Sequence, residues 1–479
     1  MASKKRVVVL GAGPAGLGAA YHLALNGHNV CVIDRAHYLG GASASFKIKD
    51  YIVDYGPHAF HIKNKDIVKI VEDLVGDDFV RVKRKSRLIL DGKNLQYPLN
   101  VKEALFKINP LLSFKILFDY VLVKIGKSIN PAGFKRNSFE DWGIDAFGYT
   151  LYKLAFGDYS EKMWGVSGKK LARELAQQKL MKLDLRKIIL KVFGIGDSTL
   201  EGGITEYYDL YPRFGIGTIF DKMAQIITKN NENKICLDTQ ITGIKLSDGR
   251  AKAVSIKRSG KDEIIEADYI ISSIPLKYLA KHLLPGAGKE LEDTLALLNY
   301  RDVRIIYIVL DKDYYSDVHW FYLLDPHFRF NRLSEQKNLN KESSPSGKTV
   351  ISLDISCNYG DKIWNMSDKE LFELALKDIG HMGIQKSHIL DYFTLKLEDV
   401  YPIYNLGFKK SFDKILGVIA GCPNIYSTGR QGLFLNNDIH DSIEMGMMAS
   451  KFILDGKDNR EWHDYVSKYI SQRLEGNVK

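Results

Sequence analysis

The stretch that decides the fold is residues 6–36, "RVVVLGAGPAGLGAAYHLALNGHNVCVIDRA". A β-branched run leads into the pattern Gly11-x-Gly13-x-x-Gly16, an alanine- and leucine-rich stretch follows, and a second β-branched run ends at Asp34. The order of strand, glycine turn, helix, strand and acid is typical of a βαβ unit that binds a dinucleotide. We therefore expect a parallel α/β sheet that begins at this end of the chain.

The residues of this unit have separate physical roles. Gly11 permits the tight turn after the first strand, Gly13 lets the backbone approach a pyrophosphate, and Gly16 allows the helix to pack closely. Free N–H groups and a partial positive charge at the start of the helix favour an anion there. Asp34 is placed to accept hydrogen bonds from an adenosine ribose, and its charge disfavours a 2′-phosphate. The sequence therefore predicts a dinucleotide site.

A second glycine pair follows in "LGGASASF" (39–46). This pattern, a few residues after the acid, resembles the FAD proteins of the glutathione-reductase and amine-oxidase superfamily. The resemblance implies an α/β fold in which a three-layer, Rossmann-like FAD-binding domain is interleaved with a substrate domain that contains a β-sheet and helices. It also implies FAD as the cofactor.

Three later segments resemble the parts of that superfamily that return to the FAD domain. "QITGIKLSDGRAKAVSIKRSGKDEIIEADYIISSIP" (240–275) resembles the hairpins and strand that contact adenine. "YPRFGIGTIFDKMAQII" (211–227) carries Gly215 before a helix, where the family brings its backbone close to the flavin. "NIYSTGRQG" (424–432) resembles the turn that closes over the ribityl-pyrophosphate.

A length of 479 residues exceeds what one hydrophobic core usually organises. The segments above predict a division of the chain into five parts. These are a first part of the FAD-binding domain with the βαβ unit and flavin-side loop (1–100), a mainly helical substrate or lid region (101–210), a second FAD-binding part (211–290), the sheet of the substrate domain (291–415), and a third FAD-binding part with a C-terminal helix (416–479).

Within the superfamily, six stretches in order resemble UDP-galactopyranose mutases. They are "YGPHAFH" (55–61), "LDGKNLQYPLNVKEAL" (90–105), "SFEDWGIDAFGYTLYKLAFGDYSEKMWG" (138–165), "FNRLSEQKN" (330–338), "LEDVYPI" (397–403) and "GRQGLFLNNDIHDSI" (429–443). The resemblance implies an enzyme that uses reduced flavin on a nucleotide-activated sugar. Such an enzyme exchanges pyranose and furanose rings without net redox change, in the biosynthesis of cell-surface polysaccharide.

The last of these stretches departs from the mutase pattern. Phe434 and Asn436 stand where mutases have tyrosines that help to hold the diphosphate, and His440 replaces an acid. Longer mutase-like flavoproteins, described as protoporphyrinogen-oxidase-like, match the "GRxGxFxxNN" form better. Two readings therefore stay open. One is the mutase, and the other is an FAD-dependent oxidoreductase of the amine-oxidase or protoporphyrinogen-oxidase type that acts on an apolar or amine substrate.

The mutase resemblance also implies roles for individual residues. His58, Arg332 and Tyr401 are the expected catalytic residues, with His58 beside the flavin and Arg332 on the diphosphate. Tyr159 and Trp164 are expected to join Arg332 and Tyr401 in binding the substrate. An arginine suits a diphosphate because its planar fork pairs bidentately with phosphate oxygens.

The expected FAD-binding residues lie in the glycine turns, in the "YGPHAFH" loop and in the segments that return to the FAD domain. They are Gly11, Gly13, Pro14, Ala15, Gly16, Asp34, Arg35, Gly40, Gly41, Ala42, Ser43, Gly56, Pro57, His58, Gly215, Ile241, Gly429, Arg430 and Asp438. No metal site is expected, because His58 and His61 have no partner cluster with ligand spacing.

The net charge of the chain says more about its binding partners than about its fold. A net charge of +10 suits an anionic small molecule such as a nucleotide sugar, an acidic membrane surface, or simply solubility. The basic run "RVKRKSR" (81–87) is expected to be solvated, and no nucleic acid is expected as a partner because no aromatic residues are interleaved with it. Scattered cysteines and the lack of a long apolar run predict a cytoplasmic protein, with peripheral membrane contact as an open alternative. A reductant such as NAD(P)H would keep the flavin reduced, and the oligomeric state stays open.

Two more stretches carry expectations of their own. "VKEALFKINPLLSFKILFDYVLVKIGK" (101–127) is predicted to form an amphipathic helix pair packed on the core. The alternative is a patch that touches a membrane or a lipid-like substrate. The polar stretch "SEQKNLNKESSPSGK" (334–348) is expected to be a loop.

Overall fold

The βαβ unit at the start of the chain forms as its glycine pattern predicts. Strand β1 (Arg6–Leu10) is buried over four of its five residues and pairs in parallel with β2 (Asn29–Ile33). Between them lies α1 (Pro14–Leu25), whose N-cap is Gly13. Its first residue is a proline, which has no N–H group, but the N–H groups of the first helical turn have no partner within the helix in any case. The predicted strand, helix and strand are therefore confirmed.

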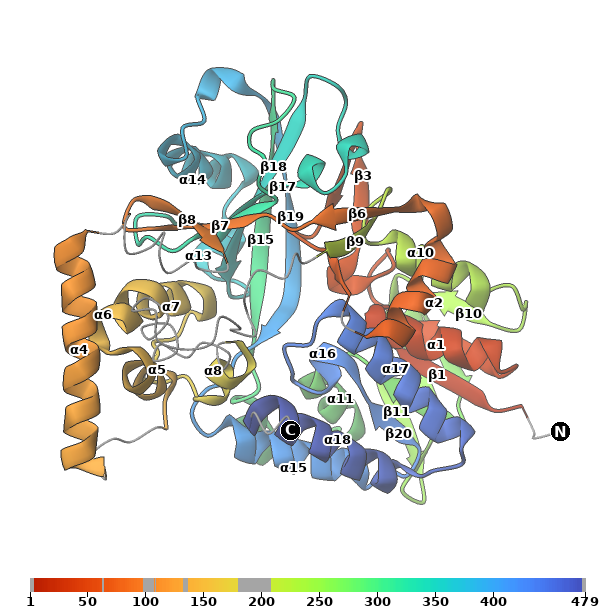
Figure 1. Cartoon of the computed structure of the whole chain (residues 1–479). Helices are drawn as coiled ribbons and strands as arrows, with labels where there is room; N and C mark the ends of the chain where they lie inside the picture. Colours follow the sequence, from red (N-terminus) through yellow and green to blue (C-terminus); the bar gives the residue numbers. More distant parts are fainter. Residues whose placement is uncertain are drawn as a thin grey trace.

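The computed structural model describes residues 4–62, 64–97, 107, 109–131, 137–179 and 208–475. The stretches 101–106 and 180–207 of the predicted helical region lie outside these described residues. Two main sheets face each other, and a group of helices stands at one side of them (Figure 1).

Four segments that are distant in sequence build the first sheet. Its strand order is β10-β2-β1-β14-β20, and every pair in it is parallel. The added strands are β10 (Lys234–Cys236), β14 (Tyr269–Ser272) and β20 (Ile425–Ser427). In such sheets ligands bind outside the carboxyl ends of the strands, which here means the ends at Leu10, Ile33 and Ser272.

Two layers cover the first sheet, so the α/β fold with a three-layer Rossmann-like part is confirmed. Helices α1, α10 (Thr218–Ile227) and α17 (Ile439–Leu454) pack together on one face. The antiparallel sheet of β11 (Thr239–Ser247), β12 (Arg250–Arg258) and β13 (Lys261–Glu266) lies on the other. Helices α1 and α17 approach closely, because a Cβ on Gly446 would lie 1.9 Å from the carbonyl oxygen of Ala15.

The remaining helices around this part of the chain border the same core. They are α2 (Lys65–Val75), α11 (Leu276–Leu283), α12 (Gly288–Leu295), α15 (Phe408–Ala420), α16 (Gly429–Gly432) and α18 (Asn459–Glu475). Their buried aliphatic and aromatic residues join one hydrophobic cluster with β1 and α1. This cluster fixes the first sheet against its covering helices.

The second sheet has seven strands in the order β19-β15-β18-β17-β16-β7-β8. They are β7 (Ser86–Leu90), β8 (Lys93–Tyr97), β15 (Tyr300–Leu310), β16 (Trp320–Leu323), β17 (Arg332–Glu335), β18 (Thr349–Cys357) and β19 (Ile389–Pro402). Residues of α14 (Asp368–His381) and α13 (Lys362–Asn365) pack on one face. Strands β3 (Ser45–Ile48) and β4 (Tyr51–Asp54) pack on the other, which brings the flavin-side loop onto this sheet.

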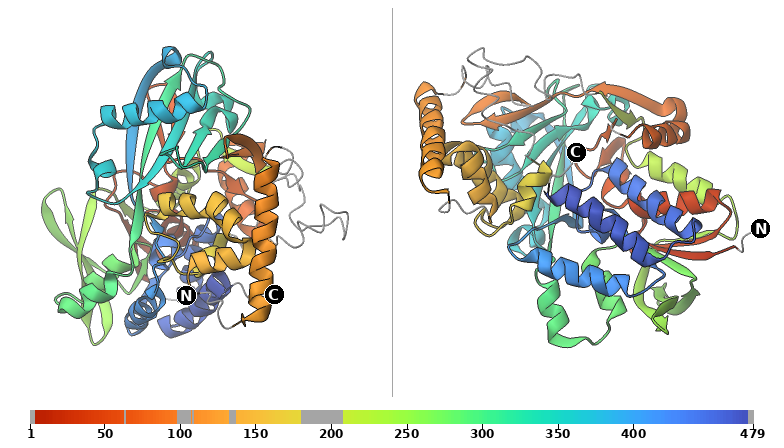
Figure 2. Two further views of the ribbon diagram at one scale, coloured as in Figure 1. Left: turned by 90° about the vertical axis from the view of Figure 1, so that its left-hand side faces the viewer. Right: turned by 60° about the horizontal axis from the view of Figure 1, so that its bottom comes forward.

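A small antiparallel sheet and a helical group complete the described chain. The small sheet contains β5 (Phe60–His61), β6 (Phe79–Lys83) and β9 (Tyr208–Pro212). The helical group contains α4 (Pro110–Ile129), α5 (Phe139–Phe147), α6 (Tyr149–Tyr152), α7 (Asp158–Trp164) and α8 (Glu174–Lys179). Helix α4 forms the outer edge of the molecule in each view of Figure 2.

Two expectations about packing are met in part. No residue of α4 is fully buried, but Leu112 packs against the small cluster of Leu88, Leu90 and Leu95, so the helix only borders the core. The stretch 334–348 begins inside β17 and then forms the predicted loop, which contains two short 3-10 turns. The first half of this loop is buried, and its Lys337, which is 4% exposed, pairs there with Asp313.

Candidate active site

A cavity of about 1000 Å³ lies between the carboxyl edge of the first sheet and one face of the second. We call the part lined by Gly11, Gly13, Asp34 and Gly41 the glycine end. We call the part lined by Trp320, Tyr322, Arg332 and Asp354 the sheet end. The cavity thus joins the predicted dinucleotide site to the second sheet.

The structure brings most of the predicted site residues to the wall of this cavity. They are Gly11, Gly13, Pro14, Asp34, Arg35, Gly41, Ala42, Ser43, Pro57, His58, Ile241, Arg332, Tyr401, Arg430 and Asp438. The others lie behind the wall or beside it: Ala15, Gly16, Gly40, Gly56, Gly215, Gly429, Tyr159 and Trp164. Gly215, for example, packs against Ser45, where a Cβ would lie 2.4 Å from the serine oxygen.

Close backbone packing shapes the glycine end. Gly11 has a φ of +101°, and a Cβ there would lie 2.4 Å from Oγ of Ser273. A Cβ on Gly16 would lie 1.9 Å from the carbonyl oxygen of Gly11. Around Gly13, by contrast, a Cβ would meet no protein atom within 4 Å. The structure therefore needs glycine at 11 and 16 for its own packing, whereas Gly13 leaves room for a ligand.

Asp34 is held at the end of β2 by backbone groups. Its carboxylate accepts hydrogen bonds from the backbone N–H groups of Ala12 and Ala36, at 2.6 and 2.8 Å. Burial raises the pKa of this carboxyl, while the two backbone donors oppose the rise. The geometry fixes an acceptor at the mouth of the glycine end, as a ribose contact requires.

His58 lines the cavity and has an unsatisfied ring nitrogen. Its Nδ1 is buried and finds no hydrogen-bond partner among the described residues. Burial, together with the nearby charges of Arg332 and Arg430, lowers the pKa of the imidazole to about 3. His58 is therefore neutral near pH 7. An orphaned buried polar atom is costly unless a ligand satisfies it.

These features together fit FAD. Its pyrophosphate suits the open space at Gly13 and the start of α1, and its ribose suits Asp34. A polar edge of the flavin ring system would satisfy Nδ1 of His58. The same cavity leaves the sheet end for a second molecule.

Arg332 is the fixed cation of the sheet end. It lies opposite Asp354 on the neighbouring strand, and its Nε donates to Oδ1 of that residue at 2.8 Å. Its Nη2 donates to the hydroxyl of Tyr401 at 3.4 Å. Burial lowers the pKa of the guanidinium, but Asp354 together with Tyr401 and Tyr159 outweighs this effect and holds the pKa above its ordinary value. Arg332 is therefore charged and held in one orientation.

The predicted aromatic residues form a layer around Tyr401. The Cζ of Arg430 lies 5.8 Å from the centre of the Tyr401 ring, and Trp164 meets that ring edge-on at 5.9 Å. Trp164 is 7% exposed, so it supports Tyr401 from behind instead of lining the cavity. Tyr159 also lies off the wall, close enough to Arg332 for the arginine charge to oppose the rise that burial causes in the tyrosine's pKa.

Sequence reasoning missed one arginine of the cavity wall, Arg84. Arg84, from the run expected to be solvated, donates to both oxygens of Asp209, at 2.6 Å from Nε and 2.5 Å from Nη2. His61 Nδ1 lies 2.7 Å from the same carboxylate. Burial raises the pKa of Asp209, but hydrogen bonds from His61 and Arg84 hold it below its ordinary value. Asp209 thus fixes two basic side chains that line the cavity.

Arg84 and Arg332 lie on either side of an aromatic floor. Tyr322 of β16 pairs directly with Arg332, and Trp320 lies two residues earlier on the same strand. The Cζ of Arg84 stands 5.9 Å from the ring centre of Trp320. No sequence motif joins these residues, because they come from β16, from β17 and from the segment just before β7, which meet only in the second sheet. Only the alternation of the strands could have suggested a shared face.

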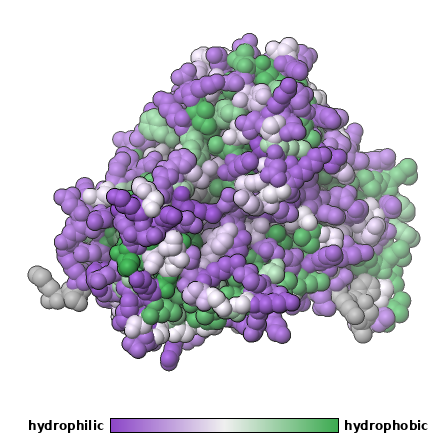
Figure 3. All heavy atoms as spheres, turned by 180° about the vertical axis from the view of Figure 1, so that it is seen from behind, coloured by the Kyte–Doolittle hydropathy of each residue, from purple (hydrophilic) through white to green (hydrophobic). Residues whose placement is uncertain are grey.

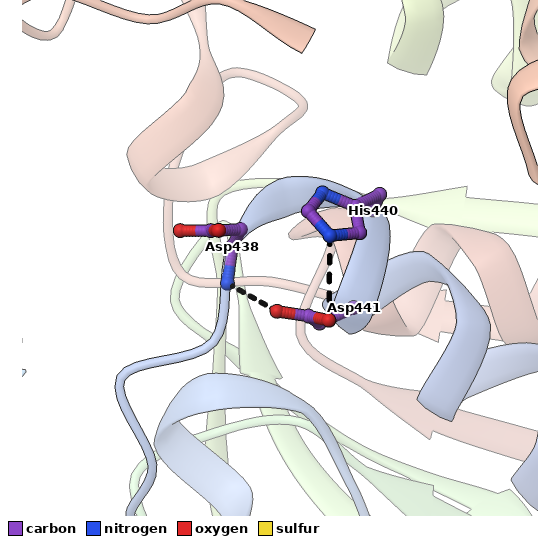
Figure 4. A group of neighbouring side chains, drawn as sticks. All are labelled: Asp438, His440 and Asp441. Atoms are coloured by element: carbon purple, nitrogen blue, oxygen red, sulfur yellow. Dashed lines mark hydrogen bonds and ion pairs between the residues drawn. The ribbon is translucent and has the colours of Figure 1, made fainter. Parts of the chain in front are cut away.

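Asp438, His440 and Asp441 form an acidic group at the start of α17, and each offers an atom within 4.8 Å of the others (Figure 4). Asp438 and Asp441 form the capping box of the helix, in which the backbone N–H of Asp438 donates to Asp441 at 3.0 Å. Asp441 also pairs with Arg473, and Nε2 of His440 lies 3.4 Å from Oδ1 of Asp441. Helix capping accounts for the group without a metal.

A family model gives the first comparison with known proteins. The model described as an NAD(P)-binding Rossmann-like domain matches residues 9–74. This range contains the βαβ unit, the second glycine pair and the flavin-side loop.

Three relatives extend the comparison along the chain. A protein described as a probable UDP-galactopyranose mutase from Klebsiella pneumoniae is 25% identical over 37% of this chain and 45% of its own length. A crystal structure of reduced UDP-galactopyranose mutase superposes with a TM-score of 0.81 at 20% identity, covering 97% of this chain and 98% of the mutase. A structure from Exiguobacterium, described as a protoporphyrinogen oxidase, gives a TM-score of 0.70 at 16% identity over 95% and 100% of the two chains.

These comparisons bear on the expectations from the sequence. The sequence match spans less than half of the Klebsiella mutase, whereas the structural match covers nearly the whole chain. They confirm the resemblance to mutase-like flavoproteins of the amine-oxidase superfamily and FAD as the cofactor. The similar structures include one described as a mutase and one described as an oxidase, so the type of reaction has to be inferred from the residues of the site.

Proposed function

We propose that this mutase-like flavoprotein isomerises the ring of a nucleotide-activated sugar between its pyranose and furanose forms. The reaction would use reduced flavin, leave no net redox change, and serve the biosynthesis of a cell-surface polysaccharide. Similarity to UDP-galactopyranose mutase in sequence and in fold supports this proposal. A reductant such as NAD(P)H would prepare the enzyme without being consumed in each turnover.

One observation carries the proposal: a charged arginine is fixed in the same cavity as the dinucleotide cradle. Arg332 is only 20% exposed, and Asp354 holds its guanidinium in place. A nucleotide sugar places a diphosphate next to its reacting carbon, and that diphosphate needs fixed positive charge when it departs. A simple apolar amine carries no anionic group that could pair with such an arginine. The preorganised charge therefore favours an anionic substrate.

The residues of the chain divide the work of the site. Bound in its reduced form, FAD supplies an electron-rich ring system for covalent catalysis without net oxidation. Arg332 binds and orients the diphosphate, and the hydroxyl of Tyr401, 3.4 Å from it, is placed beside the sugar. Neutral His58 offers Nδ1 as a hydrogen-bonding group that adds no third positive charge beside Arg332 and Arg430. Trp320 and Tyr322 offer an apolar floor for the rest of the substrate.

A substrate panel tests the reaction directly. The FAD-loaded protein, reduced with dithionite without oxygen, would be incubated with UDP- and dTDP-hexopyranoses, and the products would be separated by chromatography. We expect a furanose product from at least one nucleotide sugar, formed only by the reduced enzyme and in amounts far above that of the enzyme. The flavin absorbance should be unchanged at the end.

The oxidase reading makes the opposite prediction. An oxidase would form no ring-contracted product, would bleach its flavin with an amine or a porphyrinogen, and would take up oxygen in step with that substrate. This pattern would overturn the proposed mutase and support an oxidoreductase of the amine-oxidase or protoporphyrinogen-oxidase type.

A further inference from the structure

Helix α4 carries its apolar residues outward. Its large exposed side chains follow one stripe at spacings of three and four residues: Leu111, Phe114, Phe118, Val121, Leu122, Ile125 and Ile129, each between 49% and 79% exposed. Such spacing places them on one face of a helix. In Figure 3 apolar side chains gather at the edge of the molecule that α4 occupies. We call this face the α4 stripe.

The polar side chains of α4 point the other way. Asp119, the one acid of the helix, accepts hydrogen bonds from the backbone and hydroxyl of Thr150 on α6. Lys124 donates to the carbonyl of Asp145 at 2.7 Å, and Lys127 donates to its carboxylate at 2.9 Å. The half-buried Leu112 also packs inward, against Leu88, Leu90 and Leu95, whereas the outer face of a surface helix in a soluble protein is usually polar. Polar bonds therefore anchor α4 while its apolar face stays available.

The charge around the stripe is strongly positive. Helix α4 carries three lysines, Lys115, Lys124 and Lys127, against the single acid Asp119, and the acid faces inward. Lys115 is exposed on α4 itself. Apolar side chains combined with lysines are what an anionic lipid surface attracts. The same charge opposes the pairing of two copies through this face.

We propose that the α4 stripe docks the protein on the surface of an anionic lipid bilayer. The apolar side chains would enter the boundary between headgroups and acyl chains, and the exposed Lys115 would meet a lipid phosphate. No helix among the described residues is long and apolar enough to cross a membrane, so α4 would lie along the surface. The docking face lies on the helical group, away from the first sheet (Figure 1), and it does not depend on which reaction the cavity performs.

Vesicle flotation tests this inference. The FAD-loaded protein would be mixed with vesicles of phosphatidylcholine alone or of phosphatidylcholine and phosphatidylglycerol at 7:3. We expect it to float with the anionic vesicles, to bind the neutral ones at least tenfold more weakly, and to release partly in high salt. The triple variant Leu111→Gln, Phe114→Gln and Ile129→Gln should reduce binding at least tenfold. Its flavin content and melting temperature should be unchanged, because these side chains are exposed and glutamine favours helix.

A control variant and a measurement of the oligomeric state complete the experiment. Ile264→Gln on β13 removes an apolar side chain of similar exposure, 58%, from another face and should leave flotation unchanged. No flotation with anionic vesicles, or equal loss from the control and the triple variant, would overturn the proposal. So would sedimentation of the native protein as a dimer that the triple variant converts to a monomer, because a second copy would then occupy the stripe.

Discussion

The two ends of the cavity are built in different ways. At the glycine end the walls are backbone, and the determining contacts lie within a few residues of Gly11 or against Ser273. At the sheet end the walls are charged and aromatic side chains from three strands, held by ion pairs such as Arg332–Asp354. At the glycine end, close backbone packing leaves no room for a side chain at positions 11 and 16. At the sheet end, fixed charges determine which ligand can bind. Substitutions should therefore fail in different ways at the two ends.

The largest effect is expected from Gly16→Ala. The new Cβ would lie 1.9 Å from the carbonyl oxygen of Gly11, so the turn and α1 must shift. We expect loss of bound FAD together with a loss of about 2–3 kcal/mol or more in the free energy of unfolding. Flavin absorbance of the purified protein and urea unfolding measure the two effects.

Gly13→Ala is the matched control for that substitution. A Cβ at 13 meets no protein atom within 4 Å, so the apoprotein should unfold at nearly the native urea concentration. FAD affinity should still fall, because the methyl group would stand where the pyrophosphate approaches. Equal destabilisation of the apoprotein by both variants would mean that the two glycines do not differ as the geometry indicates.

The next largest effect is expected from Arg332→Lys. Lysine keeps a positive charge beside Asp354 but loses the planar fork, so the protein should fold and hold FAD. Mutase activity should fall by about 100- to 1000-fold, the range for loss of a preorganised group that stabilises transition-state charge. Chromatography of the furanose product under saturating substrate measures it.

Exposed Arg329 supplies the control for this test. Arg329→Lys, three residues away, should leave activity unchanged. If the Arg332→Lys variant loses FAD, Arg332 binds the cofactor and not the substrate. If the variant keeps full activity, Arg332 has no role in the reaction.

A smaller effect is expected from Arg84→Gln. Asp209 keeps His61 as a partner, and the cavity loses one positive charge. If the substrate is anionic, KM should rise about tenfold, since one charge-assisted hydrogen bond contributes roughly 1.5–3 kcal/mol, while kcat changes little. Lys85→Gln, on the exposed neighbour, should change neither value. An unchanged KM in Arg84→Gln would show that Arg84 only braces Asp209.

The effect that is smallest at pH 7 is that of His58, because it appears only as a change in the slope of stability as the pH falls. The pKa of His58 is about 3 in the folded protein, below the ordinary value of a histidine. Between about pH 6.5 and pH 3 the unfolded chain therefore binds a proton that the folded chain does not, so stability falls as the pH falls. His58→Gln is neutral in both states and removes this dependence.

Urea unfolding at a series of pH values measures that slope. We expect the native protein to lose up to about 1.4 kcal/mol per pH unit more than His58→Gln below pH 6. Parallel curves for the two proteins would mean that His58 is not held neutral by burial.

Local sequence determined the glycine end. The spacing of Gly11, Gly13, Gly16 and Asp34 fixes a turn, a helix start and a strand end within one short unit, because each contact joins near neighbours in the chain. The fold class, the FAD cofactor and the mutase-like family could follow from that unit and the ordered motifs.

Tertiary structure alone decided the sheet end and the outer helix. Arg84 looked like part of a solvated basic run until strands β7 and β16 paired and set it over Trp320. The first half of the polar stretch 334–348 is buried, and there the buried Lys337 pairs with Asp313. Helix α4 turns its apolar face outward because Asp119 and its lysines bind α5 and α6. Amphipathic spacing predicts that a helix has two faces, but which face meets the protein depends on partners that are distant in sequence.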